Sequence, residues 1–355
     1  MRCADPDLDA GPTADASTLT FRFADPGHRL AGVRLHQEAR VPGDRLAFGR
    51  TDDGWALRLP RPAVDRMEYL LELAHPGGGT ETVTDPANPL LARGAFGDKS
   101  VLLMPGYEPP RWLDDDPPPG SSRDLSVAAR ALRLDVQARL WSPAGVDPDV
   151  ALPLLVVHDG PEYAELAGLT AYLSSRVDGG ELPPVRAALL SPGPRDEWYA
   201  ANGAYTRALG LAIVPRLREE VPTTAVVGMG ASLGALAVLH AQRRRAGTFD
   251  AMFLQSGSFF HPRHDAHERR FPHYHRIVRA VDEVLRAGGH RSPVPTVLTC
   301  GGIEENIENN RVMARALAAQ GYPTELHEVR DTHNYTAWRD AFDPHLTGLL
   351  PQLSR

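Results

Sequence analysis

Two hydrophobic patterns follow one another along the chain, and they predict two different kinds of domain. Between residues 18 and 90, short runs alternate apolar and polar positions, with turn residues between them at regular spacing, as in a small all-β sandwich. The strands expected from this pattern cover residues 18–23, 32–38, 45–50, 55–59, 68–73 and 81–84. Residues 1–17 hold little apolar content, and we expect a disordered tail there.

From residue 124 onward, apolar runs typical of strands buried on both faces alternate with helical patterns. Strands are expected over residues 132–141, 152–158, 185–190, 224–228, 252–255, 296–300 and 324–329. Helices are expected over residues 164–174, 205–220 and 235–242, although Pro215 would kink the second of these. This alternation predicts an α/β domain with a mostly parallel sheet over residues 124–355. Residues 91–123 are rich in proline, glycine and aspartate, and we expect them to link the two domains.

Composition narrows the classes of protein that this chain can represent. Its 355 residues suffice for two cores, and 42% of them are hydrophobic, as in ordinary globular proteins. The net charge of −7 and the lack of a basic stripe argue against a nucleic-acid partner. No apolar run is typical of a signal peptide or a membrane span, so we expect no membrane association and a cytoplasmic location. The two cysteines, Cys3 and Cys300, do not indicate a disulfide framework, which suits a reducing compartment.

The most specific chemical signal is Gly230-Ala231-Ser232-Leu233-Gly234, which fits the Gly-x-Ser-x-Gly nucleophile elbow. In that motif a sharp strand-to-helix turn lifts a serine clear of its sheet, and small glycines let the turn close. The flanks fit, because a buried strand is expected before the motif and a helix after it. We therefore expect Ser232 to be a nucleophile. A dinucleotide fingerprint is disfavoured because Leu233 stands where its third glycine would be, and we expect no cofactor.

A serine nucleophile needs a histidine base, which a carboxylate usually orients, and in such folds the chain order is Ser, acid, His. His333, in the loop after the last expected strand, is the base that we select among 14 histidines. Glu304 follows the strand at 296–300 and is the expected acid, with Glu305 a near rival and Asp331 a more distant one. Both loops belong to the carboxyl edge of the sheet, where ligands bind in open α/β folds.

The oxyanion hole should take one backbone N–H from Leu233, the residue after the nucleophile. We expect the second in the loop His158-Asp159-Gly160-Pro161, where Gly160 permits unusual backbone angles and Pro161 has no N–H. The second donor is therefore Asp159, Gly160 or a neighbouring residue, and Asp159 is also suited to cap the helix that follows.

Weaker signals concern substrate and metal binding. Arg195 is a candidate for holding an anionic substrate group, with a structural ion pair as the alternative. Trp338 is a candidate for lining the pocket, with a place in the core as the alternative. His264 and His267 have helical spacing, but no cysteine or clear carboxylate set accompanies them, and we expect no metal site.

Taken in order, several short segments resemble the enterochelin esterase family, within the esterase-D group of α/β-hydrolases. They are Trp55 and residues 85–89, 96–105, 157–160, 195–202, 230–234, 255–260, 301–304 and 333–339. The resemblance implies an α/β-hydrolase fold preceded by a small immunoglobulin-like β-sandwich domain that helps to shape the active-site entrance. It also implies an ester hydrolase with Ser232, Glu304 and His333 as triad, acting in the best-known members on a cyclic catecholate siderophore. Asn334 departs from the aspartate common after the family's histidine, and this departure leaves the substrate open.

The sequence thus predicts a serine carboxylic-ester hydrolase that acts through an acyl-enzyme on a small-molecule ester, with siderophore trilactones as one candidate. Feruloyl and acyl-sugar esters are alternative substrates. A non-catalytic ligand- or glycan-binding protein on a hydrolase scaffold is the alternative from another class. The oligomeric state is left open.

Overall fold

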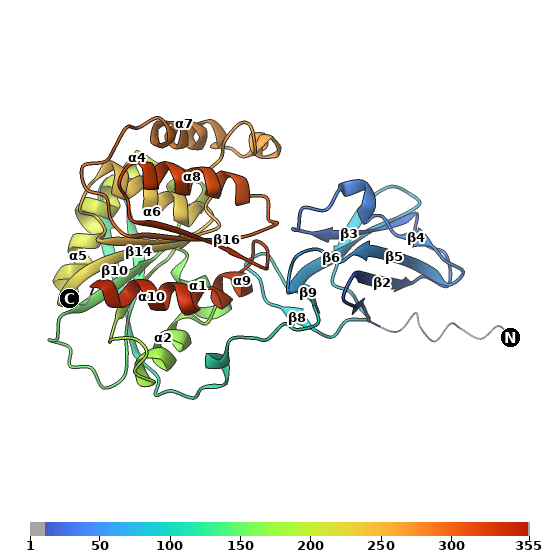
Figure 1. Cartoon of the computed structure of the whole chain (residues 1–355), viewed down its shortest axis with the longest axis horizontal. Helices are drawn as coiled ribbons and strands as arrows, with labels where there is room; N and C mark the ends of the chain where they lie inside the picture. The colour runs from blue at the N-terminus through green and yellow to red at the C-terminus, as the bar shows by residue number, and fades with distance from the viewer. Residues whose placement is uncertain (1–10, 354–355) are drawn as a thin grey trace. The chain divides into compact units, whose positions relative to one another are not determined.

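The computed structural model describes residues 11–353, whose contacts fall into two compact units (Figure 1). One unit holds the described residues up to Glu108 together with two later loops, Gly301–Glu305 and Arg330–Asn334. The other holds Pro109–Cys300, Asn306–Val329 and the remainder from Tyr335. Of the predicted disordered tail over residues 1–17, residues 1–10 lie outside the described residues, whereas Thr13–Ala14 forms strand β1.

The first unit is a β-sandwich. One antiparallel sheet has the order β1-β2-β5-β4, and the other has the order β3-β6-β9-β8, with β7 paired to β6. Phe21 and Leu57 from one sheet and Leu35 and Leu71 from the other are buried in a single core. The strands are β1 (Thr13–Ala14), β2 (Thr18–Ala24), β3 (Gly32–Gln37), β4 (Gly49–Arg50), β5 (Gly54–Pro60), β6 (Arg66–Ala74), β7 (Thr80–Val83), β8 (Leu91–Ala92) and β9 (Lys99–Leu103).

The second unit is built on a mostly parallel sheet with the strand order β10-β11-β13-β12-β14-β15-β16-β17. β10 and β11 are antiparallel additions at one edge, and the strands from β13 to β16 run parallel. The strands are β10 (Ser121–Ala129), β11 (Leu134–Ser142), β12 (Leu152–Val157), β13 (Arg186–Leu190), β14 (Thr223–Ala231), β15 (Ala251–Gln255), β16 (Thr296–Gly301) and β17 (Thr324–Val329).

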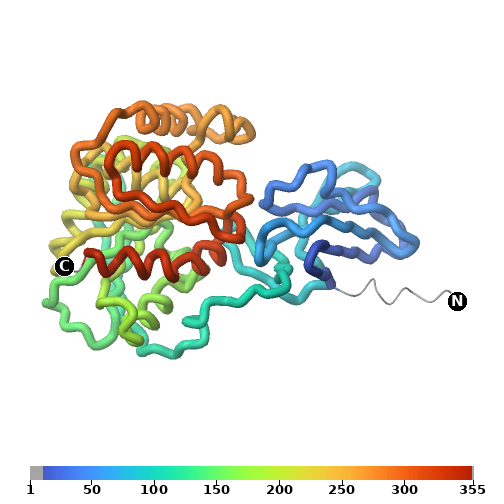
Figure 2. Tube along the Cα trace, viewed as in Figure 1, coloured from blue at the N-terminus to red at the C-terminus, as the bar shows by residue number. Residues whose placement is uncertain are grey.

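Helices cover both faces of this sheet. α4, α6, α7 and α8 lie on one face and α1, α2, α9 and α10 on the other (Figure 1). The trace shows the last described α-helices, α9 and α10, in red, on the face that carries the early green helices (Figure 2). Central strands are therefore buried on both sides, so that Val226 and Val227 of β14 belong to different cores. The α-helices are α1 (Gly160–Leu166), α2 (Leu169–Asp178), α3 (Arg195–Tyr199), α4 (Gly203–Ala208), α5 (Val214–Glu220), α6 (Leu233–Arg244), α7 (Tyr274–Leu285), α8 (Ile307–Ala319), α9 (Tyr335–Asp340) and α10 (Thr347–Leu349).

These observations confirm the predicted fold class, a mostly parallel α/β domain preceded by a β-sandwich. Three predicted elements were wrong in detail. Residues 45–50 hold the end of a 3₁₀ turn, η1 (Gly43–Leu46), and only the short β4. The helix predicted over 164–174 is two helices, because Gly168 adopts a left-handed φ of 62° between them. The helix predicted over 205–220 contains a π-helical turn, η3 (Leu209–Ile213), which ends two residues before Pro215, whose ring and missing N–H disturb the hydrogen-bond ladder of the helix.

The segment predicted as a linker, residues 91–123, has more structure than its proline and glycine content indicates. β9 pairs with β6 and completes the sandwich sheet. Trp112 lies in a 3₁₀ turn, η2 (Arg111–Asp114), and packs edge-on against Tyr172 of α2, with ring centroids 5.5 Å apart. Only 3% of Trp112 is exposed, so this part of the segment is anchored to the α/β unit. Within the described residues, no helix has the length and apolar character needed to span a bilayer.

We predict that Trp112→Ala lowers the free energy of unfolding of the α/β unit by about 3–5 kcal/mol, because the truncation empties a buried aromatic site. Its neighbour Leu113 is 40% exposed, and Leu113→Ala should change stability by no more than about 0.5 kcal/mol. Denaturant titration of the two variants checks this, and equal effects would show that Trp112 does not anchor the segment.

Candidate active site

Ser232 stands at a strained turn between β14 and α6. Its φ of 56° and ψ of −121° lie in a region that serine rarely adopts. The turn closes only because its glycines are small: a Cβ on Gly230 would lie 2.6 Å from the Gly234 carbonyl carbon, and a Cβ on Gly234 would lie 3.2 Å from His158 Cβ. The geometry is therefore that of a nucleophile elbow.

Backbone hydrogen bonds from the next strand hold the strained residue. The Ser232 N–H donates to the Gln255 carbonyl at the end of β15 (2.9 Å), and the Ser258 N–H donates to the Ser232 carbonyl (3.0 Å). The two hydroxyl oxygens, Ser232 Oγ and Ser258 Oγ, are 3.0 Å apart. Asn310 of α8 fixes this loop by bonding both the N–H and the carbonyl of Gly257.

Sequence reasoning assigned no role to Ser258 or Asn310. The only signal for Ser258 was its place in a Ser-Gly-Ser turn after an expected strand, and a distant helix supplies Asn310.

Two helices begin at the expected oxyanion donors. Leu233 is the first residue of α6 and Gly160 the first residue of α1, so both N–H groups belong to helix N-termini, where backbone amides lack intrahelical partners. The Asp159 N–H instead donates to the Tyr199 hydroxyl (3.3 Å), which favours Gly160 over Asp159 as the second donor.

The expected reason for Gly160 needs correction. The left-handed residue of this loop is Asp159, with φ 54°, rather than Gly160. Gly160 is needed for close packing, because a Cβ there would clash with the Leu189 backbone of β13.

Arg195 pairs with the carboxylate of Asp159. Its Nε lies 2.9 and 3.0 Å from the two Asp159 oxygens, and its Nη2 lies 2.9 Å from Oδ2. Burial raises the pKa of Asp159, and the Arg195 charge opposes that shift. The guanidinium also lies over the Tyr199 ring, 5.6 Å from its centroid. The ion pair therefore braces the loop that presents Gly160, and substrate binding by Arg195 stays a prediction.

Trp338 of α9 lies in the core. It is 7% exposed, its Nε1 donates to Ser256 Oγ (3.1 Å), and its carbonyl accepts a hydrogen bond from the Gln255 side chain (3.0 Å). These contacts brace the loop after β15 and favour the core alternative over a pocket-lining role.

Glu304 and His333 come together within the first unit. Glu304 Oε1 lies 3.6 Å from His333 Nδ1, in loops that follow β16 and β17 along the chain. The Glu304 side chain is 1% exposed and the His333 side chain 29%, whereas Glu305 is exposed. The carboxylate of the other rival, Asp331, pairs with Arg66. The contact with His333 and the burial favour Glu304 as the partner of the histidine.

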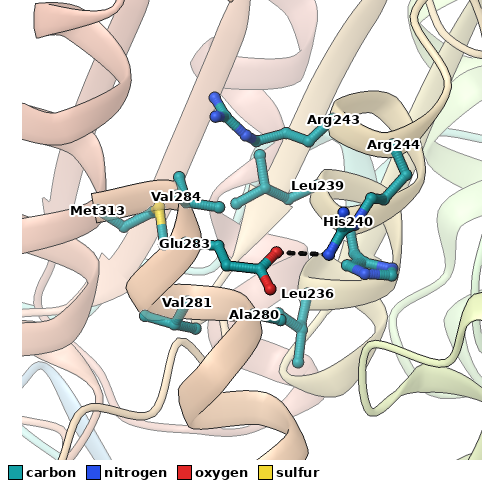
Figure 3. A pocket seen from close by; sticks show the side chains of 10 residues that line it. All are labelled: Leu236, Leu239, His240, Arg243, Arg244, Ala280, Val281, Glu283, Val284 and Met313. Atoms are coloured by element: carbon teal, nitrogen blue, oxygen red, sulfur yellow. Dashed lines mark hydrogen bonds and ion pairs between the residues drawn. The ribbon is translucent and has the colours of Figure 1, made fainter. Parts of the chain in front are cut away.

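A separate cavity of about 140 Å³ lies between α6 and α7 (Figure 3). Leu236, Val281 and Met313 line its apolar part, and an Arg244–Glu283 ion pair crosses it. Its lining comes from α6, α7 and α8 and does not include Ser232. This cavity is therefore distinct from the elbow.

Comparisons with known proteins identify a family and relatives of this chain. The family model described as "Esterase: Putative esterase" matches residues 130–349. The chain is 28% identical over 255 residues to the iron(III) enterobactin esterase of Dickeya dadantii (strain 3937), covering 66% of this chain and 58% of that protein. It is 25% identical over 198 residues to the iron(III) enterobactin esterase of Escherichia coli O6:H1, covering 53% of this chain and 49% of the relative. The chain thus spans less than two thirds of the length of either curated relative.

Solved structures share the fold. The ferric enterobactin esterase of Salmonella typhimurium superposes with a TM-score of 0.77 at 20% identity, covering 97% of this chain and 98% of that one. The enterobactin esterase of Shigella flexneri, crystallised in the presence of enterobactin, has a TM-score of 0.73 at 20% identity, covering 97% and 95%. Both superpositions extend over nearly the whole chain.

His158, beside the elbow, generates a prediction on pH dependence. It is fully buried, its Nδ1 lies 3.2 Å from the Met229 carbonyl, and burial lowers its pKa from 6.5 to about 4. The unfolded chain takes up the proton below about pH 6.5, so the stabilisation by neutral His158 is complete above that pH and is lost as the pH falls towards 4. The loss should be roughly 3 kcal/mol.

Denaturant titrations of wild type and His158→Asn between pH 7 and pH 4.5 check this prediction. The stability advantage of the wild type should shrink as the pH falls. An advantage that stays constant over this range would contradict it.

Proposed function

The chain belongs to the esterase family, and on that premise we propose that it is a serine hydrolase that cleaves carboxylic esters through an acyl-enzyme. The observation that carries the proposal is the strained Ser232 between β14 and α6, beside two helix N-termini. A residue in such a backbone conformation costs about 1–3 kcal/mol. Residues of this kind persist where the surrounding structure fixes them, and they cluster at active sites.

The proposed reaction assigns each group one task. His333 takes the proton from Ser232 Oγ as that oxygen attacks the ester carbonyl, and later returns a proton to the leaving alcohol. Glu304, whose Oε1 lies 3.6 Å from His333 Nδ1, orients the imidazole with Nδ1–H towards the carboxylate, which leaves Nε2 to act as the base. The N–H groups of Leu233 and Gly160 stabilise the charge on the carbonyl oxygen. Water then attacks the acyl-enzyme by the same route and releases the acid.

Chain topology supports the proposed triad. β14, β16 and β17 belong to one sheet, and Ser232, Glu304 and His333 each follow one of these strands within four residues. The carboxyl edge of such a sheet is where ligands bind in open α/β folds.

For the substrate we propose a trilactone siderophore ester. The proposal is supported by the curated relatives, which are named iron(III) enterobactin esterases, and by the fold that the chain shares over 97% of its length with a ferric enterobactin esterase. In this proposal Arg195, whose side chain is 30% exposed, also faces an anionic part of the substrate.

The first test is turnover of a panel of esters: iron-loaded and iron-free trilactone siderophores, feruloyl esters, acyl sugars and p-nitrophenyl acetate. We predict that Ser232→Ala lowers kcat by at least about 10⁴-fold on every ester that the wild type cleaves. The exposed Ser126→Ala is the matched control and should keep wild-type turnover. Undiminished hydrolysis by Ser232→Ala would refute the nucleophile. A wild type that binds but cleaves none of the panel would favour the non-catalytic alternative.

The second test compares two adjacent carboxylates. Glu304→Gln should lower kcat by roughly 10²–10⁴-fold, because a neutral amide holds the imidazole in the wrong tautomer and stabilises its cation less. Glu305→Gln should stay within about threefold of wild type. The reverse order in steady-state kinetics would reassign the acid to Glu305.

A further inference from the structure

The loop that carries His333 is tied to the start of β6. Loop Arg330–Asn334 and the sandwich strands belong to the same compact unit. The Asp65 N–H donates to the Arg330 carbonyl (2.7 Å), and Arg330 Nε donates to Asp65 Oδ1 (2.8 Å). These bonds link residues 265 positions apart in the sequence.

Arg66, the next residue, holds the loop by its side chain. Its Nη1 donates to Asp331 Oδ2 (3.2 Å) and to Asn334 Oδ1 (2.9 Å), while its Nη2 donates to Glu68 Oε1 (2.9 Å). Arg66 is 3% exposed, so these bonds form away from water, where charge-assisted hydrogen bonds are strong. One guanidinium thus fixes residues on both sides of His333.

Within the loop, His333 is the central residue of a tight turn. The Asn334 N–H donates to the Thr332 carbonyl (3.0 Å), across His333. Asp331 Oδ1 accepts from the Thr332 N–H (2.7 Å) and from Asn334 Nδ2 (3.1 Å). The side chains of Asp331 and Asn334, both bound by Arg66, therefore stabilise this turn.

We propose that Arg66 is a positioning residue for His333: by binding Asp331 and Asn334 together it sets where the imidazole stands relative to Glu304. The proposal rests on the proposed function, in which His333 is the base. A lysine cannot replace Arg66, because a single ammonium on a different stem does not reproduce the planar fork that reaches Asp331, Asn334 and Glu68.

The charges around Arg66 agree with this assignment. Glu68 and Asp331 are 7% and 6% exposed, so one cation compensates two buried carboxylates. Burial raises the pKa of Asp331 to about 6, and Arg66 works against that shift. Without Arg66, the loop would hold an unpaired buried carboxylate next to the histidine.

Two variants test the proposal. Arg66→Lys keeps the charge and loses the fork. Asp331→Asn keeps an oxygen for the Thr332 N–H and removes the acceptor for Arg66, and it leaves no unpaired carboxylate that would threaten folding. Each should lower kcat by up to about 10²-fold with KM within about twofold, because a displaced base slows proton transfer without changing ester binding. The kcat of the double variant should be no lower than that of the more impaired single variant, because both substitutions remove the same Arg66–Asp331 contact.

Arg58→Met, at an exposed position of β5, is the matched control and should keep the wild-type kcat. His333→Ala, measured on the same ester, distinguishes failure of the proposed base from failure of the positioning role of Arg66. If His333→Ala is inactive while folded Arg66→Lys and Asp331→Asn keep the wild-type kcat, the positioning role is wrong and the proposed function stands. If His333→Ala keeps wild-type activity, the proposed base fails and the positioning role fails with it. A lower unfolding midpoint with unchanged kcat would show that Arg66 is only structural.

Discussion

The strained backbone at Ser232 is the constraint on which the rest of the α/β unit depends. A serine with φ 56° and ψ −121° keeps this conformation only where neighbouring residues fix its backbone. Gly230 and Gly234 admit the close approach of strand and helix, and bonds from Gln255 and to Ser258 fix the peptide groups on either side. The parallel strands beside β14 supply this frame, and they are buried on both faces.

Buried polar and aromatic groups hold the loop that lies next to the elbow, through contacts with both its side chains and its backbone. Asp159 is left-handed, its carboxylate is bound by Arg195, and its N–H donates to Tyr199. Neutral His158 packs edge-on against Tyr199, with centroids 5.1 Å apart. The common result is a fixed start for α1, which supports our proposal that the Gly160 N–H serves the oxyanion.

The sequence predicted the parts of this protein that local pattern determines. Alternation and apolar runs located most of the strands, and the Gly-x-Ser-x-Gly pattern located the strained turn, because the glycines there are required by packing. Glu304 and Glu305 could not be told apart, since both follow β16 and only the fold decides that Glu304 is buried beside His333. Contacts between residues far apart in the chain could not be predicted from local sequence patterns. Arg195 and Asp159 are 36 positions apart, and Arg66 and Asp331 are 265 apart. β9 was missed because the prolines and glycines around it predicted a linker.

The most direct measurement of the central claim is peptide mapping by mass spectrometry after treatment with a serine-directed fluorophosphonate. We predict one adduct per chain, located on Ser232, that appears at the same rate as ester hydrolysis is lost. An adduct elsewhere with Ser232 unmodified, or full loss of hydrolysis without any adduct on Ser232, would contradict it.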